Sequence, residues 1–145
     1  MESTLTQNAA QNTTPNLAGK FDSMNTPSLV EFSTKEESLQ YPGVFDVTPT
    51  ELNQKKSQVV IIDVREPDEF TGELGHIPGA QLISLNHLAA KSEKIPKDKT
   101  VVFVCRSGGR SGKATAWALG AGWSNVFNMK GGMLLWNDLH LPTEI

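Results

Sequence analysis

Short apolar runs, each about the length of one strand, recur along the chain from residue 59 onwards. Residues 59–64 (VVIIDV) and 101–104 (VVFV) are rich in β-branched side chains and do not alternate with polar ones. Such runs are typical of strands that are covered on both faces, as in parallel sheets. Two shorter strands are predicted, at residues 81–84 and 126–128.

Helices are predicted between these strands. Thr48, Pro49 and Glu51 occupy the N-cap, first and third positions of a capping box, which predicts a short helix towards Lys56. Strands that alternate with helices favour parallel pairing with helices on both faces of the sheet, so the predicted fold class is α/β. The further helices are expected to begin at residues 67–69 and to span residues 85–91, 111–121 and about 133–138.

The first 40 residues have a different character from the rest. They are rich in Asn, Gln, Thr and Ser, contain Pro15 and Pro27, and carry apolar residues only singly. Such a segment buries too little apolar surface to offset the entropy lost on ordering. We therefore expect a flexible polar tail over residues 1–40 and one domain over residues 41–145, with Phe21 and Phe32 as the side chains that could dock on it.

The composition, 38% hydrophobic and 20% charged over 145 residues, is ordinary for a soluble globular protein. No run approaches the roughly 18 consecutive apolar residues of a membrane span. The first residues lack the basic start and apolar core of a secretory signal, so we expect a cytoplasmic protein with no membrane contact. With one cysteine and no metal-spaced cluster of ligands, neither a disulfide nor a metal or other cofactor is expected, and Cys105 acts as a thiol.

The formal net charge of −3 conceals an uneven distribution of charge. Residues 99–137 contain five basic residues and no acidic one, whereas the rest of the chain has 16 acidic and 8 basic residues. This local excess favours a small anionic ligand. Nucleic acid is disfavoured because the basic residues are few and the pI is about 5.6.

Residues 105–110 (CRSGGR), here named the cysteine loop, link a buried strand to a helix. In an open parallel sheet, ligands bind beyond the carboxyl ends of the strands, which is where Cys105 falls. Gly108 and Gly109 allow the backbone to turn its N–H groups inwards, and the following helix adds the positive end of its dipole. With Arg106 and Arg110 nearby, we expect the loop to bind an anion and to favour the reactive thiolate.

Other cysteine and glycine motifs fit the spacing less well. A C-x-x-C pair would need a second cysteine at Gly108, and a phosphate-binding Walker loop would need other residues at Ser107 and Ala114. Cysteine phosphatases have C-x5-R, usually after a histidine, whereas Arg110 here gives C-x4-R after Val104. The smaller ring suits the terminal sulfur of a persulfide better than a tetrahedral phosphate.

Four segments, in this order, resemble the rhodanese family. They are residues 63–70 (DVREPDEF), 75–80 (GHIPGA), 105–111 (CRSGGRS) and 131–136 (GGMLLW). The resemblance covers about residues 45–142 and leaves the tail unexplained. It implies a rhodanese-like three-layer fold, in which a central, mostly parallel sheet has helices on both faces.

The resemblance also implies a chemistry. Cys105 would accept the outer sulfur of thiosulfate or a related anionic donor as a persulfide and pass it to cyanide, a thiol or an acceptor protein. Two rival functions stay open: a sulfur carrier, sensing or binding module without turnover, and, disfavoured by the short ring, a cysteine phosphatase or arsenate reductase. The implied substrate-binding residues are Arg106, Ser107, Gly108, Gly109, Arg110 and Ser111.

Three residues outside the loop are candidates for supporting roles. Asp63 and Arg65 lie at the carboxyl end of a predicted strand; we assign Asp63 a structural role, while Arg65 either steers an anionic donor or pairs locally. His76 is assigned to turn formation and packing, because a cysteine that is already ionised needs no general base.

Overall fold

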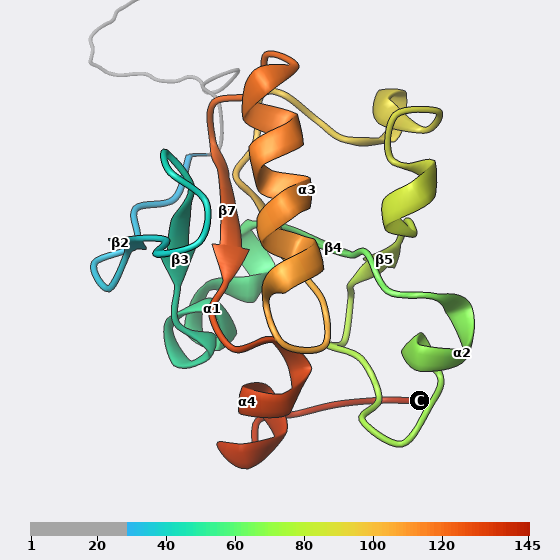
Figure 1. Cartoon of the computed structure of the whole chain (residues 1–145). Coiled ribbons are helices and arrows are strands. Elements are labelled where there is room, and N and C mark those ends of the chain that lie inside the picture. The colour runs from blue at the N-terminus through green and yellow to red at the C-terminus, as the bar shows by residue number, and fades with distance from the viewer. Residues whose placement is uncertain (1–28) are drawn as a thin grey trace, which may run out of the picture.

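The computed structural model describes residues 29–145, which fold around a six-stranded sheet of order β2-β3-β7-β6-β4-β5 (Figure 1). Every neighbouring pair in this sheet is parallel except β2 and β3, which are antiparallel. The α/β prediction is confirmed. The strands are β2 (Glu36–Glu37), β3 (Phe45–Val47), β4 (Val60–Asp63), β5 (Gln81–Leu82), β6 (Val101–Val104) and β7 (Val126–Met129).

Helices cover both faces of the sheet, with α3 on one side and α1 and α4 on the other (Figure 1). Side chains of β6 alternate between the two layers: Phe103 packs with α3, whereas Val102 and Val104 join the cluster that contains Met133 of α4. Burial on both faces explains why this strand is apolar throughout. The helices are α1 (Pro49–Lys55), α2 (Pro67–Phe70), α3 (Gly109–Gly120) and α4 (Gly132–Asp138).

One predicted helix is wrong. Residues 85–91 do not form an α-helix; a 3₁₀ turn over Leu85–His87 is followed by turns and a second 3₁₀ turn, Ser92–Lys94. The Ser84 side chain makes no capping bond, and its hydroxyl donates to the Arg65 carbonyl at 3.1 Å. Without a cap, and with few buried side chains to hold it, the segment does not overcome the unfavourable nucleation of a helix.

The start of α1 agrees with its predicted cap, but only half of the capping box forms. The hydroxyl of Thr48 accepts a hydrogen bond from the Glu51 N–H at 3.3 Å. The Glu51 carboxylate instead accepts from the backbone N–H groups of Ser33 at 2.8 Å and Thr34 at 2.9 Å, and from Lys55 at 2.8 Å. This buried carboxylate therefore ties an earlier segment of the chain to the helix.

That earlier segment, residues 29–40, was assigned to the tail from its sequence, yet in the structure it packs on the domain. Phe32 is 4% exposed and meets the Phe127 ring edge-on at 5.2 Å, and the Val30 N–H donates to Thr100. The folded domain therefore begins before residue 41, held by one aromatic side chain and by backbone bonds to a buried carboxylate. Residues 1–28, including Phe21, lie outside the described part of the chain.

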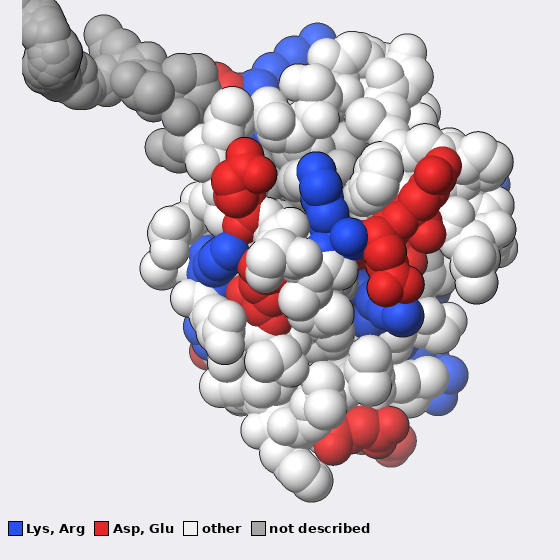
Figure 2. All heavy atoms as spheres, turned by 90° about the vertical axis from the view of Figure 1, so that its left-hand side faces the viewer, with Lys and Arg blue, Asp and Glu red and all other residues white. Residues whose placement is uncertain are grey.

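The outer strand β2 consists of two exposed glutamates, and charge of this kind discourages pairing with another chain. Figure 2 views the molecule from the left of Figure 1, where β2 and β3 lie, and shows acidic and basic side chains close together. One such pair is Lys130 with Glu36, 3.3 Å apart. No helix within residues 29–145 is long and apolar enough to cross a membrane.

Candidate active site

Cys105 directly follows β6 and is buried, with 1% of its surface exposed. Its sulfur accepts two hydrogen bonds, one from the Gly108 N–H at 3.0 Å and one from the Ser111 hydroxyl at 3.2 Å. The first donor belongs to the cysteine loop and the second to the first turn of α3. The cysteine loop and α3 therefore each direct one donor at the sulfur of the single cysteine.

Two glycines explain why the backbone can take this shape. Gly108 is the N-cap of α3 and has φ +107°, a conformation that side-chain-bearing residues rarely adopt. At Gly112, an added Cβ would lie 2.7 Å from the ring of Tyr41, which packs against the start of α3. The helix begins at Gly109, two residues before the predicted start, so Arg110 and Ser111 lie in its first turn.

The beginning of α4 holds the other side of the cysteine loop. The N–H groups of Met133 and Leu134 donate to the carbonyl oxygens of Cys105 at 2.8 Å and Arg106 at 3.0 Å. A Cβ on Gly132 would lie 2.3 Å from the Arg106 oxygen. The second glycine of the GGMLLW segment is therefore required for the close approach of α4 to the loop.

The two loop arginines, which the sequence placed together in the anion site, have different environments. Arg110 forms a bidentate ion pair with Glu69 of α2, with both N–O distances 2.8 Å. The hydrogen bond from Arg110 lowers the pKa of Glu69 to about 2, although burial opposes this. Arg106 is exposed and has no ion pair within residues 29–145.

Glu69 was not recognised as a site residue from the sequence, where it counted only as part of a helical first turn. It lies 41 positions before Arg110. No local pattern signals such a pair, because the contact joins side chains of α2 and α3, which are far apart in the sequence.

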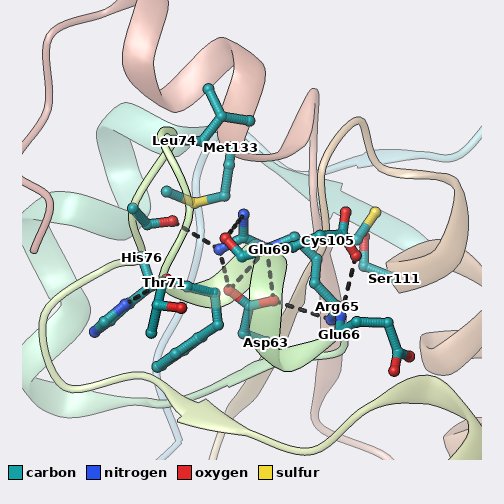
Figure 3. A network of polar contacts seen from close by, with 12 residues as sticks. Asp63, Arg65, Glu66, Glu69, Thr71, Leu74, His76, Cys105, Ser111 and Met133 are labelled. Atoms are coloured by element: carbon teal, nitrogen blue, oxygen red, sulfur yellow. Dashed lines mark hydrogen bonds and ion pairs between the residues drawn. The ribbon is translucent and has the colours of Figure 1, made fainter. Parts of the chain in front are cut away.

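Arg65 forms a buried network of hydrogen bonds at the end of β4. It is 1% exposed; its Nε donates to the Asp63 carboxylate at 2.9 Å, and its Nη2 donates to that carboxylate at 2.8 Å and to the Gly75 carbonyl at 2.7 Å. Nη1 donates to the Glu69 carbonyl at 3.2 Å (Figure 3). Arg65 and Asp63 thus join the end of β4 to α2 and the following turn, and the guanidinium is already satisfied there.

His76 contributes to the same region by packing. Its ring stacks on Phe70 with a centroid distance of 3.7 Å, and its Nδ1 lies 2.8 Å from the Phe70 carbonyl. His76 and Cys105 lie on opposite sides of the network in Figure 3. No set of three His, Cys, Asp or Glu residues within the described range is arranged to hold a metal ion.

Two hollows flank the cysteine loop. The smaller, of about 270 Å³, is lined by Arg65 and Arg106 together with the acidic residues Asp68, Glu69 and Glu73. The larger, of about 510 Å³, is lined by Ser107, Gly108 and Gly109 and by residues of β2 and β3. A buried cysteine with directed donors, an exposed arginine and adjoining space for a small molecule form a site suited to nucleophilic chemistry on an anion.

Residues 48–139 match the family model described as "Rhodanese-like domain". The chain belongs to the rhodanese-like domain family. This rhodanese-like domain is 37% identical over 84 residues to a protein of Allochromatium vinosum named "Sulfurtransferase", covering 58% of this chain and 77% of that one. It is 34% identical over 91 residues to "Thiosulfate sulfurtransferase GlpE" of Pseudomonas putida, covering 63% and 80%. The names of these relatives support sulfurtransferase activity.

Other relatives carry less information about activity. A Synechocystis protein, slr1261, is 37% identical over 99 residues, which are 67% of this chain but only 54% of that protein. Among solved structures, a rhodanese-related protein of Thermoplasma volcanium has a TM-score of 0.64 at 25% identity, covering 68% of this chain and 96% of that one. A Rhodopseudomonas palustris protein described as a "Possible Tyrosine Phosphatase" has a TM-score of 0.62 at 28% identity, covering 68% and 83%.

Proposed function

We propose that this rhodanese-like domain moves a sulfane sulfur from thiosulfate, or a related anionic donor, to a nucleophilic acceptor through a persulfide on Cys105. The observation that carries the proposal is the pair of hydrogen bonds to the Cys105 sulfur from Gly108 and Ser111. Donors fixed in advance around a sulfur atom stabilise negative charge there without further reorganisation. Thiosulfate also appears in the name of a relative, GlpE.

The reaction divides into two displacements. The Cys105 thiolate attacks the outer sulfur of thiosulfate, a new S–S bond forms, and the old S–S bond breaks with its electron pair leaving on sulfite. An acceptor such as cyanide or a thiolate then attacks the terminal sulfur of the persulfide, and the electron pair of the broken bond returns to Cys105. Thiocyanate or a new persulfide is released. Each step conserves charge and needs no external oxidant or reductant.

The chain's own residues would assist both displacements. Arg106, exposed beside the smaller hollow, attracts the anionic donor. The Gly108 N–H and the Ser111 hydroxyl hold the attacking sulfur when it is anionic, both before the first step and after the second. The bonds from α4 to the carbonyls of Cys105 and Arg106 keep the loop in position throughout.

Phosphate ester hydrolysis is the second candidate, favoured by the fold shared with the Rhodopseudomonas protein described as a "Possible Tyrosine Phosphatase". Two features argue against it. The ring of C-x4-R is one residue shorter than in cysteine phosphatases, and the Arg110 guanidinium already binds a carboxylate.

The deciding experiment uses intact-protein mass after incubation with thiosulfate and desalting. We expect a gain of one sulfur atom, followed by its loss and the appearance of thiocyanate when cyanide is added. Cys105→Ser is the matched control and should show neither, because the chain has no other thiol. A stable persulfide that no acceptor removes would indicate a carrier, and hydrolysis of an aryl phosphate faster than sulfur transfer would indicate a phosphatase.

A further inference from the structure

In the ion pair between Glu69 and Arg110, each side chain is positioned by the helix that carries it. Glu69 is the third residue of α2, and its Oε1 also accepts a hydrogen bond from the Glu66 N–H at 3.0 Å in a complete capping box. Arg110 lies in the first turn of α3 and bonds both carboxylate oxygens. The contact therefore joins two helices beside the cysteine loop.

This pair changes the charge that the loop presents. Arg110 lies in the first turn of α3, five residues after Cys105, and its hydrogen bonds to the Glu69 carboxylate raise its pKa, although burial opposes this. Two of its five N–H donors are directed at Glu69, and the positive charge is matched by a carboxylate at 2.8 Å. Of the two loop arginines, only Arg106 lines the adjoining hollow and forms no ion pair within residues 29–145.

We propose that Glu69 is a positioning and specificity residue: by holding Arg110, it restricts anion recognition at the loop to Arg106 and limits the advantage of a dianionic over an uncharged reactant. The proposal rests on the proposed function in naming thiosulfate as that dianion. The preference of the cysteine loop for charged or uncharged reagents can be measured whether or not thiosulfate is the donor.

The test compares Glu69→Gln with Asp68→Asn. Asp68 borders the same hollow from the same helix but makes no bond to Arg110, so both variants remove one negative charge from one place. Glutamine is also accepted at the third position of a capping box, which keeps α2 intact. Thermal melting of each variant verifies the fold.

Cys105 is alkylated in each protein with anionic iodoacetate and with neutral iodoacetamide. Because the chain has one cysteine, each rate reports on that site alone. We expect Glu69→Gln to raise the ratio of the iodoacetate rate to the iodoacetamide rate by about three- to tenfold, since it leaves the charge of Arg110 unpaired beside the cysteine loop. Asp68→Asn should change this ratio less than about twofold. The KM for thiosulfate should fall by a similar factor in Glu69→Gln with little change in kcat.

Equal effects of the two variants would overturn the proposal, because the net charge alone would then explain the result. So would an unchanged ratio in Glu69→Gln, or a Cys105 that neither reagent reaches in any variant. If the wild type forms no persulfide from thiosulfate, the proposed function fails while the alkylation ratio still measures the role of Glu69.

Discussion

Gly132→Ala should displace the cysteine loop and slow sulfur transfer in a protein that still folds. The new Cβ would lie 2.3 Å from the Arg106 carbonyl oxygen and 2.5 Å from the Ser107 nitrogen, and ordinary contact begins near 3.4 Å. Either the loop or the start of α4 must therefore move by about 1 Å. Both movements strain the bond from Met133 to the Cys105 carbonyl, now 2.8 Å long.

A misplacement of about 1 Å at a catalytic group can lower the rate roughly a hundredfold, which corresponds to about 2.7 kcal/mol in the activation barrier. Sulfur transfer by Gly132→Ala should fall by that order. Gly132 also has φ +59°, so an alanine there carries a conformational cost of about 1–2 kcal/mol regardless of contacts.

Gly79→Ala provides the control. Gly79 has φ +89°, yet an added Cβ would meet nothing within 4 Å. We expect it to lose about 1–2 kcal/mol in the free energy of unfolding while keeping its transfer rate within about twofold. Urea unfolding and thiocyanate formation, measured on both variants, separate the two effects. Normal sulfur transfer by a folded Gly132→Ala would refute the claim that α4 sets the position of the loop.

Three further outcomes are expected. Phe32→Ala should lower the free energy of unfolding by about 3 kcal/mol, because the ring is 4% exposed, whereas Leu39→Ala on the same segment should leave urea unfolding unchanged. Burial alone would raise the pKa of Glu51, but its hydrogen bonds outweigh this and hold the pKa well below the ordinary value of 4.5. The carboxylate therefore stabilises the fold above about pH 4.5 and loses this effect on further acidification, so Glu51→Gln should be less stable by about 2 kcal/mol at pH 7 with a deficit that shrinks towards pH 2 in urea titrations. Insertion of one glycine between Gly108 and Gly109 should widen the loop, shift the Ser111 hydroxyl away from the Cys105 sulfur and reduce thiocyanate formation about a hundredfold; an unchanged rate would contradict the ring-size argument.

Much of the fold follows from local pattern. The apolar run at residues 101–104 predicts a strand buried on both faces, and β6 is that strand. Thr48 and Pro49 mark the start of α1. The predicted helix over residues 85–91 does not form, because Ser84 provides no cap and Leu88 alone in this segment is buried.

The features of the site likewise include some that the sequence predicts and some that depend on tertiary packing. Cys105 at the end of a strand, the glycine-containing turn and the helix that follows are consecutive in sequence, so the sequence alone could locate them. The pairing of Arg110 with Glu69, the satisfied guanidinium of Arg65 and the contact of Phe32 depend on side chains that meet only after the layers pack. A charged residue near a reactive one in sequence is therefore not evidence that its charge is available.

The attachment of α4 to the cysteine loop bears on the order of events during synthesis. Cys105 precedes α4 by more than twenty residues, and its carbonyl receives the Met133 N–H only when that helix has docked. Until then the strand, the turn and α3 can assemble while the peptide groups beside the sulfur stay unanchored. A nascent or locally opened domain would thus contain the thiol while the loop around it is not yet fixed. The cysteine loop would reach its final geometry only when α4 docks.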